Sequence, residues 1–69
     1  MRIDYADGHR ASRARAVLEL YGIAVTVVFG VRVGADPAAP RVSRIELTDV
    51  DMAKTLEMLK RHDLMGATD

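Results

Sequence analysis

Two histidines and one serine are the side chains of this 69-residue chain best suited to acid–base or nucleophilic chemistry. His9 follows a predicted turn at Asp7-Gly8, and His62 stands next to Asp63. Adjacent residues on a helix point in different directions, so the last two residues do not form a catalytic dyad. Ser12 lacks the strand–turn–helix motif that exposes a nucleophilic serine. We therefore expect a protein that is not an enzyme.

Metal and cofactor sites also lack a sequence pattern. The chain has no cysteine, which excludes disulfides and thiolate ligands. Its two histidines have no carboxylate at a ligand spacing on the same predicted element. The glycines form neither a phosphate-binding loop nor a dinucleotide-binding motif. We predict no metal and no cofactor.

Arginines carry the strongest signal for nucleic-acid binding. Arg10, Arg13 and Arg15 lie near the start of a predicted helix, where cations oppose the helix dipole unless phosphates sit nearby. Arg32 and Arg44 are predicted on an open sheet face. The net charge is zero, and Arg13 and Arg15 project about 200° apart on a helix. Nucleic-acid binding through these five arginines is therefore our alternative hypothesis.

The residues 23–33, IAVTVVFGVRV, form the clearest predicted element. Apolar side chains occupy every odd position, and β-branched residues are abundant, as in a half-buried strand. Eleven residues are too few to cross a bilayer, which needs about 20, so we expect no membrane association. The absence of a signal peptide pattern favours the cytoplasm.

Two helices are predicted, one before this strand in the chain and one after the strand that pairs with it. The first covers about residues 8–21, with Asp7 as N-cap, and ends in a Schellman motif at Gly22-Ile23. The second covers about residues 50–65, begins at a cap on Thr48 or Asp49, and ends at Gly66. The inner face predicted for the second helix comprises Met52, Ala53, Leu56 and Leu59.

Two further strands are predicted over about residues 2–5 and 41–48, and residues 34–40 form a hairpin loop. Parity gives a register that keeps the large apolar residues, Phe29 included, on the face under the helices. The pairs proposed are Val27–Leu47, Phe29–Ile45 and Val31–Ser43. Residues 67–69 are expected to fray.

The predicted order, β-α-β-β-α, gives a single small α+β domain spanning residues 1–69, with a three-stranded mixed sheet and both helices on one face. Two sheet orders remain open. If the strand order is 1-3-2, the layout is ferredoxin-like without its last strand, and residues 23–33 lie at a sheet edge. If the order is 1-2-3, the same strand is central.

Size and patterning together favour a protein–protein interaction module. A domain this small is marginally stable, and without disulfides or metals it gains most from oligomerisation. Our leading hypothesis is a homodimer, or a subunit that binds another protein, acting through the edge of residues 23–33, the open sheet face or the Met58/Met65 side. A regulatory domain with a small-ligand site between subunits is a weaker third hypothesis. The residues predicted to contact a partner are Thr26, Val28, Arg32, Met58 and Met65.

Overall fold

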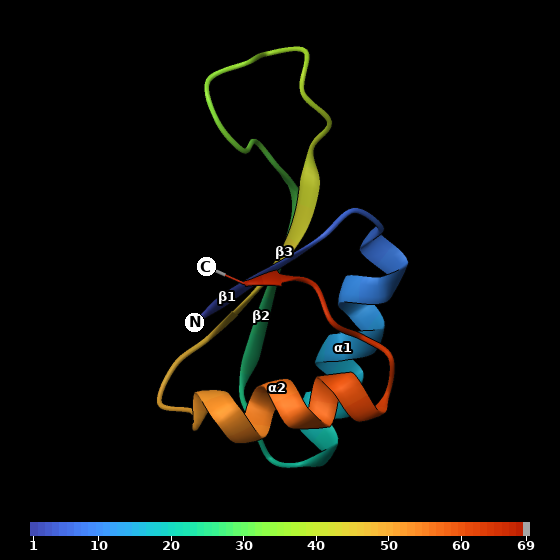
Figure 1. The fold of residues 1–69 in the computed structure, drawn as a ribbon, viewed down its shortest axis with the longest axis vertical. Coiled ribbons are helices and arrows are strands. Elements are labelled where there is room, and N and C mark those ends of the chain that lie inside the picture. The colour runs from blue at the N-terminus through green and yellow to red at the C-terminus, as the bar shows by residue number, and fades with distance from the viewer. Residues whose placement is uncertain (69) are drawn as a thin grey trace.

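The computed structural model of the chain describes residues 1–68 and contains two helices and four strands in the order β-α-β-β-α-β (Figure 1). The α+β class is confirmed. The elements are β1 (Arg2–Tyr5), α1 (Gly8–Leu20), β2 (Val25–Val31), β3 (Val42–Leu47), α2 (Met52–Arg61) and β4 (Ala67–Thr68).

The strands form one sheet in the order β2-β3-β1-β4, in which every neighbouring pair is antiparallel. The sheet was predicted to have three strands and to be mixed, and both details are corrected here. β1 and β2 run parallel because α1 crosses over between them, but β3 lies between them and opposes both. This is the 1-3-2 order, so β2 stands at a sheet edge.

The additional strand is β4, which pairs Ala67 with Asp4 and Thr68 with Ile3. These two residues were expected to fray together with Asp69, which lies outside the described residues. Pairing with β1 gives their backbone groups partners that a free chain end lacks. The fourth strand completes the ferredoxin-like layout that the first three suggested.

Helix α1 begins and ends close to the predicted positions because its local signals are strong. The Asp7 side chain accepts a hydrogen bond from the backbone N–H of His9 at 2.9 Å. At the other end the N–H of Ile23 donates to the carbonyl of Leu18 at 3.1 Å, and Gly22 has a φ of 80°. The predicted Schellman motif is confirmed, and it turns the chain directly into β2.

Helix α2 is shorter than predicted at both ends. Its N-cap is Asp51, which accepts from the N–H of Lys54 at 3.1 Å, so neither Thr48 nor Asp49 caps it. It ends at Arg61 because Asp63 takes a left-handed φ of 54° and the N–H of Leu64 donates to Leu59 at 2.8 Å. This second Schellman motif needs no glycine, and for that reason the sequence pattern placed the end too late, at Gly66.

The inner face of α2 matches the prediction in part, since Leu59 is buried and Leu56 packs against the core. Met52 and Ala53 are exposed, whereas Thr55 and Leu59 are buried. Thr55 tolerates burial because its hydroxyl donates to the carbonyl of Asp51 at 2.8 Å. The buried face of α2 is therefore centred on Thr55 and Leu59.

Between β2 and β3 the register is shifted by two residues from the prediction. Val25 pairs with Leu47 and Val27 with Ile45, so the same parity still faces the helices. After Val28 the register shifts again, because Phe29 and Gly30 together oppose one residue of β3, and Gly30 has a φ of 67°. This β-bulge reverses the parity of the rest of the hairpin.

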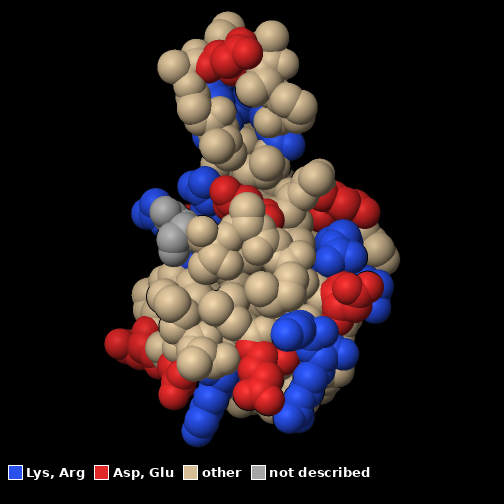
Figure 2. Space-filling model, viewed as in Figure 1, with Lys and Arg blue, Asp and Glu red and all other residues tan. Residues whose placement is uncertain are grey.

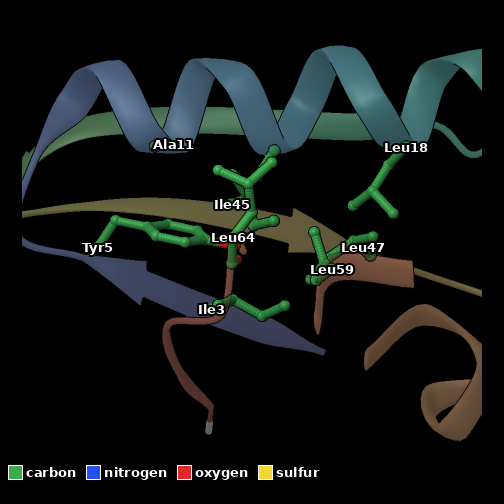
Figure 3. Close-up of a cluster of buried hydrophobic side chains, with 9 residues drawn as sticks. Ile3, Tyr5, Ala11, Leu18, Ile45, Leu47, Leu59 and Leu64 are labelled. Atoms are coloured by element: carbon green, nitrogen blue, oxygen red, sulfur yellow. The ribbon is translucent and has the colours of Figure 1, made fainter. Parts of the chain in front are cut away.

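The core lies between the sheet and both helices, and its side chains interdigitate under α1 in Figure 3. Leu64, which follows α2, projects into it beside Ile45. The buried apolar residues are Ile3, Tyr5, Ala11, Ala14, Leu18, Ile45, Leu47, Leu59 and Leu64. Within the part of the chain that is described, no helix is long and apolar enough to cross a membrane.

Tyr5 links the core to the segment after α2. Its hydroxyl donates to the carbonyl of Leu64 at 2.6 Å, and burial raises the pKa of Tyr5 from 10.0 to about 12 while the Arg10 charge opposes that rise. The folded state therefore holds this proton more tightly than the unfolded state does. The resulting stabilisation is complete below pH 10 and is lost as the pH rises to about 12.

We expect the stability advantage of the wild type over Tyr5→Phe to shrink between pH 10 and 12, since only the wild type has this proton to lose. Near neutral pH the variant should lose about 1 to 2 kcal/mol, because the Leu64 carbonyl is left buried without its donor. Urea unfolding at several pH values measures both effects. A stability difference that stays constant up to pH 12 would contradict the assignment.

Candidate protein interaction site

The backbone of β2 offers hydrogen-bonding groups along the edge of the sheet. Met1 and Leu47 exchange two hydrogen bonds, at 2.8 and 2.9 Å, so the backbone of Leu47 faces β1. Backbone groups of an antiparallel strand alternate in direction, so Glu46 and Arg44 face β2 and bond to their partners Thr26 and Val28. The N–H and C=O groups of Val25 and Val27 consequently point away from the sheet.

The side chains of β2 do little to discourage pairing at this edge. None of the residues Val25–Val31 is charged, and Val28 and Phe29 are both exposed. Proteins usually protect an edge strand with charges, proline or a covering element. The bulge at Phe29 and Gly30 bends the far end, but it leaves the first half of β2 regular.

Phe29 does not face the core, contrary to the predicted pairing with Ile45. It is 60% exposed, and its ring lies against the start of α1, where a Cβ at Gly8 would come within 3.3 Å of two ring atoms. Phe29 therefore adds exposed apolar surface to the edge.

Beyond the bulge, residues 32–41 form a projecting loop at the top of Figure 1. The Asp36 side chain accepts from the N–H of Ala38 at 2.9 Å, which orders the tip, and Arg41 donates to the carbonyl of Gly30 at 2.9 Å. Figure 2 shows a mostly uncharged tip, with basic groups at the neck of the loop. Arg32 is exposed in this loop, away from the regular half of β2.

The open face of the sheet carries more charge than the pattern of residues 23–33 alone suggested. Arg44 donates to both carboxylate oxygens of Asp4, at 2.7 and 3.1 Å. These hydrogen bonds hold the pKa of Asp4 below its usual value against the opposing effect of burial, and the charges of Arg44 and Arg2 add to them. Thr26 and Val28 lie on this face beside Glu46 and Arg44.

Met58 and Met65 do not share a helix face, because α2 ends at Arg61. Met58 is half-buried and borders an open depression of about 220 Å³ together with Tyr21, Ile23 and Val50. Met65 lies in the segment before β4 and is exposed. The two methionines therefore do not form one contact surface.

The five arginines of the alternative hypothesis lie in different parts of the molecule. Arg10 donates to the carbonyls of Asp63 and Met65, at 2.9 and 3.4 Å, and so fastens the segment after α2. Arg13 is exposed on α1, and Arg15 pairs with Glu19 at 3.1 Å. Arg32 belongs to the projecting loop, and Arg44 pairs with Asp4 on the open face. Nucleic-acid binding stays a prediction, without a common surface for these five residues.

The two histidines belong to the ends of different helices. His9 is exposed in the first turn of α1, and His62 is exposed at the C-cap of α2. Among residues 1–68 no group of three or more His, Cys, Asp or Glu side chains is placed to hold a metal ion.

Comparison with protein-family models, with curated proteins and with solved structures finds no match to this chain. Function therefore has to be inferred from the edge, the surfaces and the packing described above. Val25 and Val27, whose backbone groups form this edge, were not among the contact residues predicted from the sequence. That prediction considered only which face of the sheet each side chain occupies. Alternation of backbone direction along a strand was the signal available to find them.

Proposed function

We propose that the chain is a non-catalytic protein–protein interaction module that self-associates by strand pairing at the β2 edge. The observation that carries this proposal is the outward direction of the backbone groups of Val25 and Val27 in an uncharged edge strand. A strand of another chain added there satisfies these groups and extends the sheet.

The size of the chain supports the same proposal. A 69-residue domain buries a modest share of its apolar surface, so association adds stability that its own core cannot supply. The opposite edge of the described sheet is β4, which has two residues and offers a much shorter template. Pairing at β2 is therefore the favoured route to an assembly.

Backbone amide exchange measured by NMR tests the proposal one residue at a time. We expect the amides of Val25 and Val27 to exchange quickly in dilute protein and to become protected as its concentration rises. The amides of Thr26 and Val28 serve as an internal control, since they bond to β3 within one copy and should be slow throughout.

Sedimentation of the same samples reports the oligomeric state. Protection of Val25 and Val27 that rises together with mass supports the proposal. A protein that remains monomeric with both amides unprotected overturns it. An oligomer in which these amides still exchange quickly also overturns it, because association then uses the open face or another surface.

A further inference from the structure

One side of α1 lies along the β2 edge. Gly8 approaches the ring of Phe29, and Ser12, Arg15 and Glu19 follow it at helical spacing on the same side. Arg10 projects from the opposite side, where it bonds to the segment after α2. We call Ser12, Arg15 and Glu19 the edge flank of α1.

The edge flank carries one positive and one negative charge in a fixed order. Arg15 and Glu19 form an ion pair at 3.1 Å, yet their side chains remain 52% and 48% exposed. A surface with one charge of each sign is complementary to a second copy of itself when a two-fold axis passes midway between the two charges. Arg15 of each copy then faces Glu19 of the other.

The position of such a two-fold axis follows from the geometry of the elements. Helix α1 and strand β2 run in opposite directions (Figure 1), and Gly8 lies level with Phe29. The midpoint between Arg15 and Glu19 lies about 13 Å further along the helix. That distance corresponds to about four residues of strand. Because β2 runs opposite to α1, the residue of β2 level with this midpoint lies four positions before Phe29, at Val25.

We propose that the partner strand is β2 of a second copy, which runs antiparallel to the first and is related to it by a two-fold axis at Val25. Arg15 on the edge flank of each copy then pairs with Glu19 on the edge flank of the other. This inference rests on the proposed function and adds the partner, the register and the residues that select it. Val25 then pairs with Val25, and the N–H of Val27 donates to the carbonyl of Ile23, whose own N–H already bonds to Leu18. The pairing therefore stops short of the bulge. The assembly closes at two copies, because each β2 edge is used by the other.

A single introduced cysteine tests the register, since the chain has none of its own. We expect Val25→Cys to form a disulfide-linked dimer under mild oxidation, because paired residues of antiparallel strands lie within disulfide range. Val28→Cys is the matched control. Its side chain is more exposed, but the two copies lie about 20 Å apart in this register and should not cross-link.

Charge exchange tests the edge flank. We expect Arg15→Glu to raise the dimer dissociation constant roughly tenfold, because it places acidic side chains against Glu19 of the other copy. The double variant Arg15→Glu with Glu19→Arg restores complementarity and should return the constant to near the wild-type value. Sedimentation equilibrium at low salt measures both variants, with circular dichroism to show that they are folded.

These outcomes separate this inference from the proposed function. Cross-linking at Val25 but not at Val28, together with rescue by the double variant, supports the arrangement. Concentration-dependent protection of the Val25 and Val27 amides without those two results overturns the arrangement and leaves the edge pairing intact. A monomeric wild-type protein with unprotected amides overturns both.

Discussion

Leu64→Ala is expected to lower the free energy of unfolding by about 3 kcal/mol. The Leu64 side chain is fully buried in the core of Figure 3, so truncation removes apolar contacts and leaves a cavity. A chain of this size has a total stability of roughly 3 to 10 kcal/mol, so the loss is a large part of it. Urea unfolding followed by circular dichroism, at one fixed protein concentration, measures the change.

Leu20→Ala is the matched control for this experiment. It removes the same atoms from the last residue of α1, where the side chain is 86% exposed. We expect a change of no more than about 0.5 kcal/mol. Similar losses for the two variants would show that Leu64 does not belong to the core.

Gly66→Ala is expected to destabilise the fold by about 2 to 3 kcal/mol, through overpacking and not through a cavity. A Cβ at this position would lie 2.5 Å from the backbone oxygen of Asp4, 2.9 Å from Ile3 Cγ2 and 3.0 Å from Tyr5 Cε1. Two of these neighbours are buried, and the closest is backbone, so β4 must move away from β1 to make room.

Ala67→Ser adds one heavy atom at the adjacent, exposed position and is the control for Gly66→Ala. Its effect should stay within about 0.5 kcal/mol. The measurement is again urea unfolding, with amide exchange at Ile3 and Asp4 reporting whether pairing with β4 is lost. A neutral Gly66→Ala would mean that residues 66–68 do not pack against β1 as described.

Both large effects fall on the segment after α2, which the helical pattern had assigned to the helix itself. Three contacts hold this segment in place: the Tyr5 hydroxyl on the Leu64 carbonyl, Arg10 on the carbonyls of Asp63 and Met65, and Gly66 against Asp4. Each joins residues more than fifty positions apart in the chain. No local pattern records such contacts.

The candidate site, too, was predicted only as far as local side-chain pattern allows. Side-chain parity in residues 23–33 correctly separated Val25 and Val27, which face the helices, from Thr26 and Val28 on the open face. It could not place the bulge, because a bulge depends on how Gly30 and Phe29 meet a second strand. The bulge accounts for the wrong orientation of Phe29 and for one of the two residues of register error. The other residue of error is already present on the loop side, where Val31 pairs with Val42 and not with Ser43.

Short-range chemistry determined the elements at the start of the chain. Asp7 at the first cap, Gly22 at the first helix end and the β-branched run after it act within a few residues, and their effects were predicted from the sequence. The α+β class and the placement of both helices on one face followed from these local features and from the handedness of crossovers.

Tertiary structure alone decided which edge of β2 stays open. The sequence allowed β1 to lie beside β2 or beside β3, since both arrangements bury the same apolar face. Placement of β3 between them pairs Asp4 with Arg44 and Ile3 with Ile45, and it leaves the outward groups of Val25 and Val27 at the rim. That choice depends on contacts between residues about forty positions apart, and it creates the surface on which the proposed assembly depends.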